Sequence, residues 1–277
     1  MTRKNAIVTG SSSGFGLLCV LELAKSGFHV IATMRDISKA DKLFEEARKQ
    51  NSEPFIEVQP LDVTSSESIS QFTSYLSNLN SVDILVNNAG IAIGGFCEEL
   101  SIDDYRQQFD TNFFAVVAIT QAVLPFMRKS GGGRMINMSS ISGQFGFPGL
   151  SPYAASKHAL EGFSESLRLE VKPFGIDVVL IEPGSYKTNI WTSMDQISIS
   201  ENSPYHSYMV KLQTEIESEK ANHGSPEEVA ALVAQVASQE KTPKLRYPIG
   251  KSVKTNIRLK AFLPWQFIES LIFKKLR

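Results

Sequence analysis

The chain has little cysteine, no excess of positive charge and no long apolar run, and each shortage excludes a class of protein. Its 277 residues include two cysteines, too few for a disulfide framework or a cysteine-built zinc site. The net charge of -1 argues against a nucleic-acid partner, because phosphate-binding surfaces carry a basic excess. No uninterrupted apolar run approaches the roughly 20 residues that span a bilayer. We therefore expect a globular, cytoplasmic protein without a metal site.

Short runs rich in Val and Ile recur along the chain and alternate with helical stretches. Most runs are apolar throughout, which is typical of strands covered by helices on both faces. The predicted strands are 5–9, 28–33, 55–59, 83–87, 134–138, 176–182 and 245–249. Strands and helices in alternation imply right-handed crossovers and a parallel sheet. The sequence therefore predicts one doubly wound α/β domain over residues 1–277, with helices on both faces of a seven-stranded parallel sheet.

Helix starts are marked by residues that cap N-termini. Thr64, with Glu67 three residues later, fits a capping box, and Ser101 precedes an acid-rich first turn. We expect long helices over 103–127 and 153–171, and both carry apolar residues on more than one side.

A glycine-rich turn follows the first predicted strand and opens a helix. It reads Thr9-Gly10-Ser11-Ser12-Ser13-Gly14-Phe15-Gly16. Glycines allow a tight turn and close approach of the backbone to a pyrophosphate, and the helix N-terminus supplies unpaired N–H groups. The strand before and the helix after favour dinucleotide binding over a plain Ser/Gly turn.

The spacing Thr-Gly-x-x-x-Gly-x-Gly resembles the short-chain dehydrogenase/reductase family, and later motifs extend the resemblance over nearly the whole chain. They are Asn87-Asn88-Ala89-Gly90, Asn112, Ser140, Tyr153-x-x-x-Lys157, and Pro183-Gly184 with Thr188. The resemblance implies a Rossmann-type fold and hydride transfer with a nicotinamide dinucleotide. The stretches 32–36 and 246–250 are similar to the hydroxysteroid and retinol dehydrogenase branch.

Tyr153 and Lys157 share one helix face because they are four residues apart. A nearby ammonium favours phenolate, so we expect Lys157 to lower the pKa of Tyr153 from its usual value of about 10. Tyr153 is then the expected proton donor and acceptor at the substrate oxygen, and Ser140 donates a hydrogen bond to that oxygen. The resemblance implies that Lys157 also binds the nicotinamide ribose and that Asn112 holds a water linking Lys157 to solvent.

The choice between NADP and NAD is expected just beyond the second strand. Met34 stands where the family often has an acid for the ribose of NAD, and Arg35 follows, where a guanidinium binds the 2′-phosphate of NADP. NADP(H) is therefore the expected cofactor; the alternative is that Arg35 is a solvated charge and Asp36 selects NAD(H). The full set of expected cofactor-binding residues is Gly10, Ser12, Ser13, Gly14, Phe15, Gly16, Arg35, Asp62, Val63, Asn88, Ala89, Gly90, Tyr153, Lys157, Pro183, Gly184 and Thr188.

Aromatic residues in loops predict an apolar substrate pocket. Phe145, Phe147 and Trp191 are the candidates, with core packing as the alternative, and residues 185–225 are the expected substrate lid. We expect an NADP(H)-dependent enzyme that interconverts a hydrophobic secondary alcohol and a ketone or aldehyde. The alternative is an NADP(H)-binding regulator without turnover, but a sensor has no chemical need for Ser140, Tyr153 and Lys157.

Residues 241–277 form a basic, aromatic C-terminal extension. It holds ten basic residues and one acid, Glu269, whereas the other 240 residues hold 18 basic and 28 acidic groups. Three uses are open: a cover over the active site, an interface between subunits, or a contact with an anionic membrane. Apolar protein contacts are the commoner use. The resemblance also implies a homodimer or homotetramer built on the long helices.

Overall fold

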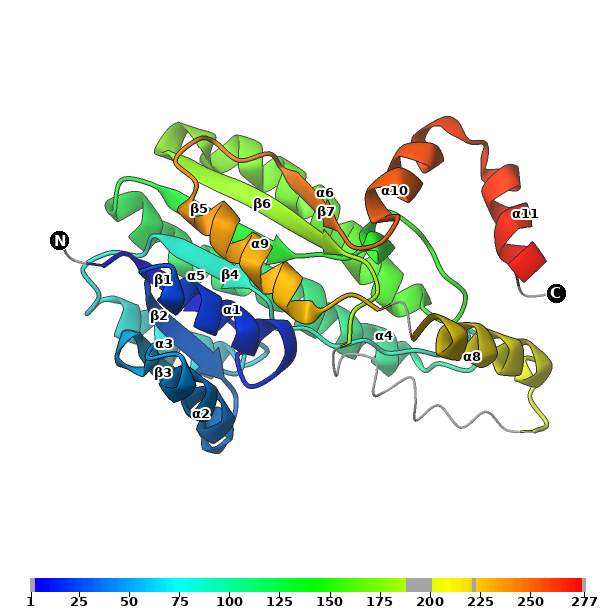
Figure 1. Ribbon diagram of the computed structural model, residues 1–277, viewed down its shortest axis with the longest axis horizontal. Coiled ribbons are helices and arrows are strands. Elements are labelled where there is room, and N and C mark those ends of the chain that lie inside the picture. Colours follow the sequence, from blue (N-terminus) through cyan, green and yellow to red (C-terminus); the bar gives the residue numbers. More distant parts are fainter. Residues whose placement is uncertain (1–2, 188–200, 221–222, 276–277) are drawn as a thin grey trace.

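Seven parallel strands form a single sheet in the order β3-β2-β1-β4-β5-β6-β7 (Figure 1). The computed structural model describes residues 3–187, 201–220 and 223–275. The expected doubly wound α/β fold is confirmed. The strand order reverses between β1 and β4, and ligands of such sheets bind beyond the carboxyl ends of the strands at this switch point.

The elements alternate along the chain as expected. The strands are β1 (Asn5–Val8), β2 (His29–Met34), β3 (Ile56–Pro60), β4 (Ile84–Asn87), β5 (Gly133–Met138), β6 (Ile176–Pro183) and β7 (Arg246–Ile249). The main helices are α1 (Gly14–Lys25), α2 (Asp41–Lys49), α3 (Ser66–Leu76), α4 (Ile102–Phe109), α5 (Ala115–Lys129), α6 (Ser151–Val171), α8 (His206–Lys220), α9 (Pro226–Ser238), α10 (Val253–Phe262) and α11 (Trp265–Lys275). Each predicted strand ends within one residue of the observed one.

Two apolar cores, one on each face of the sheet, hold the domain together. Helices α1, α2 and α9 pack on one face, and α3, α5 and α6 pack on the other. Successive side chains of a strand point to opposite faces, so Ala6 and Val8 enter the first core while Ile7 enters the second. This double burial explains why apolar residues occupy successive positions of the central strands.

The helix expected over 103–127 is interrupted. A π-helical turn, Asp110–Phe114, joins α4 to α5. The stretch 102–129 contains an 18-residue window with a mean hydropathy of 1.3, which is long and apolar enough to cross a membrane by length and composition alone. Its side chains Ile119, Val123 and Met127 are nevertheless part of the core beneath the sheet. The stretch is therefore a core element of this domain.

One of the two predicted helix caps is wrong. Ser101 and Asp104 form a capping box at the start of α4, as expected. At α3 the cap is Ser65, whose Oγ accepts from the backbone N of Ser68 at 3.2 Å. Thr64 instead donates its hydroxyl to Asp62 at 2.7 Å. The helix therefore starts one residue later than the Thr64–Glu67 spacing predicted.

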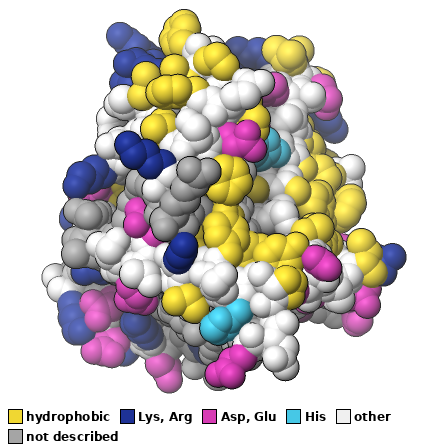
Figure 2. Space-filling model, turned by 90° about the vertical axis from the view of Figure 1, so that its right-hand side faces the viewer, with side chains coloured by type: hydrophobic (Ala, Val, Ile, Leu, Met, Phe, Trp, Pro, Cys, Tyr) yellow, Lys and Arg dark blue, Asp and Glu magenta, His cyan; other side chains and the backbone are white. Residues whose placement is uncertain are grey.

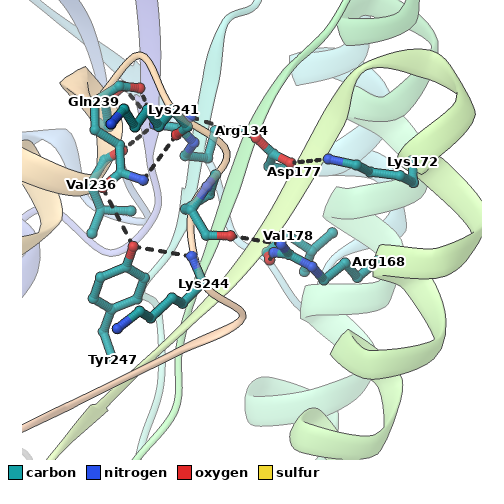
Figure 3. Close-up of polar contacts among 12 residues, drawn as sticks. Arg134, Arg168, Lys172, Asp177, Val178, Val236, Gln239, Lys241, Lys244 and Tyr247 are labelled. Carbon is teal, nitrogen blue, oxygen red and sulfur yellow. Dashed lines mark hydrogen bonds and ion pairs between the residues drawn. The ribbon is translucent and has the colours of Figure 1, made fainter.

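A polar network anchors the segment between α9 and β7 to the central strands (Figure 3). Arg134 of β5 donates to the carbonyl oxygens at the end of α9 and lies 3.6 Å from Asp177 of β6. Arg168 of α6 donates to the carbonyl of Pro243 at 2.7 Å. These contacts fix the start of β7, and with it Arg246, beside β6.

Candidate active site

The glycine-rich turn between β1 and α1 has a shape that only glycine fits. Gly10 and Gly14 have φ values of +68° and +56°, in the left-handed region that favours glycine. A Cβ at Gly16 would lie 2.2 Å from the carbonyl oxygen of Gly10, and one at Gly10 would lie 2.8 Å from Cα of Ala89. The turn thus forms a backbone cradle at the N-terminus of α1, which fits the pyrophosphate of a dinucleotide.

The Asn88-Ala89-Gly90 segment is bonded directly to this turn. Oγ1 of Thr9 accepts from the backbone N of Asn88 and of Ala89, each at 3.0 Å. Nδ2 of Asn88 donates to the carbonyl oxygens of Thr9 and Gly10 at 2.8 and 3.1 Å. The two motifs, nearly 80 residues apart in sequence, therefore form one rigid floor at the switch point.

A cavity of about 850 Å³ runs along the carboxyl ends of the strands and collects most of the predicted site. Gly16 and Asn112 are not among the residues that line it; Gly16 packs against the turn, and Asn112 lies behind the wall. Thr188 and Trp191 lie outside the described residues. The predicted residues that line the cavity are Gly10, Ser12, Ser13, Gly14, Phe15, Arg35, Asp62, Val63, Asn88, Ala89, Gly90, Ser140, Tyr153, Lys157, Pro183 and Gly184.

Tyr153 and Lys157 of α6 meet the end of β5 inside this cavity. Both are buried, and Nζ of Lys157 donates to the carbonyl oxygen of Met138 at 2.7 Å. Burial raises the pKa of Tyr153 to about 12, and a hydrogen bond with Ser140 works against that rise. The expected lowering of the Tyr153 pKa by Lys157 is therefore wrong, because burial outweighs the other influences. The phenol is protonated at neutral pH.

Lys157 is affected by burial in the opposite sense. Burial lowers its pKa to about 8, while the nearby Glu161 carboxylate raises it. The amine is still mostly an ammonium at pH 7. A buried cation, a neutral phenol and the Ser140 hydroxyl thus face one cavity.

Asn112 connects the π-helical turn to the cofactor loop. Its Oδ1 accepts from the backbone N of Ile91 and its Nδ2 donates to the carbonyl of Ile91, both at 2.9 Å. Nδ2 also donates to Oγ of Ser156 at 3.3 Å, and Ser156 donates in turn to the carbonyl of Tyr153. Asn112 therefore ties the loop after β4 to the helix that carries Tyr153.

At the far end of the cavity, Arg35 is exposed and Met34 is buried beneath it. Asp36 is not among the lining residues. Its Oδ1 accepts from the hydroxyl and backbone N of Ser38, at 2.7 and 3.1 Å, and these bonds lower its pKa. Asp62 is held in the same way by Thr64. Asp36 therefore serves as the N-cap of the short helix Ile37–Ala40.

A buried carboxylate pair, Glu161 and Glu182, lies behind Lys157 and was missed by the sequence reasoning. Nε of Arg246 lies 2.8 Å from Oε2 of Glu161 and 3.4 Å from Oε1 of Glu182. Gln144 donates to both carboxylates, at 3.3 and 3.0 Å. Burial, and next the charge of Glu161, raise the pKa of Glu182 to about 7. The available signal was Glu182, which follows the apolar run Val178–Ile181 at the end of β6.

The expected substrate aromatics lie beside the main cavity. Phe145 is buried, with its ring centroid 6.2 Å from that of Phe147, and neither residue lines the cavity. Phe147 instead lines a second groove of about 510 Å³. Tyr186, which the sequence reasoning overlooked, does line the main cavity and packs edge-on against Phe15 at 5.7 Å. Within the described residues, no group of His, Cys, Asp and Glu is placed to hold a metal ion.

The fold and the cavity define a dinucleotide-dependent oxidoreductase, and comparison with known proteins gives its family. The short chain dehydrogenase family profile matches residues 4–197, so the chain belongs to this family. Its members use a nicotinamide dinucleotide to oxidise or reduce small molecules at a CH–OH group.

The chain is 50% identical to the uncharacterized oxidoreductase YusZ of Bacillus subtilis, over 100% of this chain and 99% of that one. It is 36% identical to the 3-ketodihydrosphingosine reductase of Bacteroides thetaiotaomicron, over 93% and 92% of the two chains. It is also 35% identical to retinol dehydrogenase 8 of Bos taurus, over 94% and 86%. A solved short-chain dehydrogenase from Streptomyces avermitilis superposes with a TM-score of 0.80 at 32% identity, covering 99% and 96%. The resemblance to the retinol dehydrogenase branch is confirmed.

Proposed function

We propose that the protein is an NADP(H)-dependent carbonyl reductase and alcohol dehydrogenase acting on hydrophobic ketones, aldehydes and secondary alcohols. The observation that carries this proposal is the meeting of Ser140, Tyr153 and Lys157 in the same cavity as the glycine-rich turn. A regulator that only binds the dinucleotide has no use for a buried phenol and a buried amine, which are costly to bury without a role.

Tyr153 is the proposed proton donor in the reductive direction. Its raised pKa keeps the hydroxyl protonated at neutral pH, so a proton is available for the substrate oxygen. Ser140 stabilises negative charge that develops on the same oxygen. Lys157 places a positive charge within 5.7 Å of the Tyr153 ring, which favours the phenolate once the proton has left. The dinucleotide, held by the glycine-rich turn, supplies the hydride.

The substrate class is tested by following NADPH oxidation with the intact protein. The aromatic loop 145–147 and the apolar groove beside it support bulky apolar carbonyl compounds. We expect turnover within a panel of steroid, retinoid, long-chain aliphatic and aromatic ketones, and none with sugar phosphates. A clear preference for a phosphorylated or highly charged carbonyl compound would contradict the proposed class.

NADP(H) is the proposed cofactor, and Arg35 is the proposed ligand of its 2′-phosphate. Arg35 lines the cavity, whereas the Asp36 carboxylate is bonded to Ser38. A hydrogen bond to a charged group contributes roughly 1.5–3 kcal/mol, so Arg35→Ala should lower kcat/KM for NADPH about 10–150-fold. The value for NADH should change less than about threefold.

The matched control for Arg35 is Asp36→Asn, which removes the neighbouring charge and should leave the NADPH preference unchanged. A wild-type enzyme that prefers NADH tenfold would overturn the assignment, and so would a selective loss of NADH turnover in Asp36→Asn, because Asp36 would then be the residue that selects the cofactor.

We propose first that the active form is a homodimer or homotetramer. We propose second that the protein acts in the cytoplasm. Phe114 of the π-helical turn and Leu169 of α6 support the first proposal, because 56% and 78% of their surfaces are exposed. A monomer in sedimentation at micromolar concentration would contradict it. The free thiols of Cys19 and Cys97 agree with a reducing compartment.

A further inference from the structure

The two C-terminal helices, α10 and α11, extend from the body beyond β7 and expose large apolar side chains (Figure 1). Phe262 is 85% exposed, and Trp265, Phe267, Leu271 and Phe273 are each about half exposed. Neither helix contributes to the lining of the main cavity. A cover over the cofactor is therefore not what these side chains form.

Cations alternate with these apolar side chains. Lys254, Arg258 and Phe262 are spaced by four residues and share one face of α10. On α11, Phe267, Leu271 and Lys274 share one face and are exposed, whereas Ile268 is buried. All three cations are exposed. An aromatic and basic helix surface of this kind is typical of helices that lie in the headgroup region of a bilayer.

Basic residues outnumber acids in this region. Residues 251–274 contain five Lys and Arg and one acid, Glu269. Glu269 is exposed and lines the second groove, between α11 and the start of α6. Lys260 donates to the carbonyl oxygen of Gln144. The region therefore carries a net positive charge, although the chain as a whole carries a net charge of -1.

We propose that the α10–α11 surface docks on an anionic lipid bilayer, with its aromatic side chains among the headgroups and its cations against the lipid phosphates. Charge argues against a second copy of the chain as the occupant. A two-fold interface would press this positive surface against itself, and lysine is depleted from the cores of protein interfaces. Lipid phosphates complement the same charges.

The second groove lies between this surface and the loop beside the candidate active site. It is lined by Phe147 and Pro148 of the loop beside the main cavity, by Tyr208 of α8, and by Trp265, Ile272 and Phe273 of α11. Figure 2 shows hydrophobic side chains gathered over the upper part of this face and around a hollow below it. A docked bilayer lies at the mouth of this groove and supplies apolar substrates through it. This delivery step rests on the proposed function, whereas the docking does not.

Co-sedimentation of the intact chain with lipid vesicles tests the docking. We expect binding to vesicles of phosphatidylglycerol and phosphatidylcholine, little binding to pure phosphatidylcholine, and a marked loss of binding at 0.5 M salt. Each Lys or Arg beside an anionic surface strengthens binding about fivefold, so Lys254→Gln with Arg258→Gln should weaken it about thirtyfold. Phe262→Ser with Leu271→Ser should weaken it at least about tenfold.

A matched variant controls for the loss of charge alone. Lys42 and Lys49 are exposed cations of α2, so Lys42→Gln with Lys49→Gln removes the same charge from another part of the surface and should bind as wild type does. Wild-type protein that fails to sediment with anionic vesicles overturns the proposal. So does a Phe262→Ser, Leu271→Ser variant that dissociates a wild-type dimer without any vesicle binding, because the surface is then a subunit interface. Because sedimentation does not measure turnover, a negative result leaves reduction of a water-soluble ketone untouched.

Discussion

Tyr153→Phe should lower the rate of ketone reduction at least about a thousandfold while NADPH still binds nearly as tightly as to wild type. General acid catalysis contributes roughly 10²–10⁴-fold, and the phenol is the neutral acid that faces the cavity beside Ser140. The ring remains in the variant, so the packing of α6 against the loop after β4 is kept. The measurements are kcat with an accepted ketone and the Kd of NADPH from fluorescence titration.

Three variants separate a chemical role of Tyr153 from a structural one. Ser140→Ala should lower kcat less, about 10–100-fold, because it removes one hydrogen bond to the reacting oxygen. Tyr75 lies on α3, where its ring packs on Phe72 outside the cavity. Tyr75→Phe also removes a buried tyrosine hydroxyl, and it should leave kcat unchanged. Undiminished turnover in Tyr153→Phe would mean that another group donates the proton.

The sheet and the cofactor motifs were predictable because local pattern determines them. Strands such as β1 and β6 are buried at every position, and their runs of Val, Ile and Leu mark them in the sequence. The glycines of the turn could be recognised from their spacing. That spacing is strict because the φ values and close contacts at these positions admit no side chain. The N-cap of α3 was predicted wrongly because Thr64 and Ser65 can both cap a helix. The three-residue spacing from Thr64 to Glu67 favoured Thr64, whereas the structure uses Ser65.

The electrostatics of the site were not predictable from spacing. The Tyr153–Lys157 spacing puts both residues on one helix face, but it does not reveal that both are buried or that Lys157 donates to Met138. Burial sets the protonation state of each, and burial is a property of the whole fold. The carboxylate pair was hidden for the same reason: Glu161, Glu182 and Arg246 come from three elements that meet only in the folded sheet.

Arg246→Met should destabilise the folded protein by about 3 kcal/mol, near the lower end of the ~3–5 kcal/mol range for breaking a buried ion pair. The side chain of Arg246 is 30% exposed, which screens part of its charge, but Glu182 is fully buried and Glu161 nearly so. Without the guanidinium, two buried acids lie side by side, and Gln144 and Ser139 donate hydrogen bonds to them. For a domain of this size we expect Tm to fall by about 6–12 °C, measured by calorimetry.

The loss caused by Arg246→Met should grow with pH, since Glu182 changes charge near neutrality. Its folded-state pKa, about 7, lies above its usual value of 4.5, so the protonated form is favoured by folding. That contribution is fully present below pH 4.5 and is lost as the pH rises through about 7. At pH 5.5 Glu182 is mostly protonated, and at pH 8.5 it is mostly a carboxylate that the variant no longer neutralises, so the Tm deficit should be larger at pH 8.5. Glu182→Gln keeps the shape of the protonated acid; combined with Arg246→Met it should restore part of the stability at pH 8.5 and remove most of the pH dependence. A deficit that is equal at both pH values, with or without Glu182→Gln, would show that Arg246 stabilises the sheet by packing rather than by neutralising the pair.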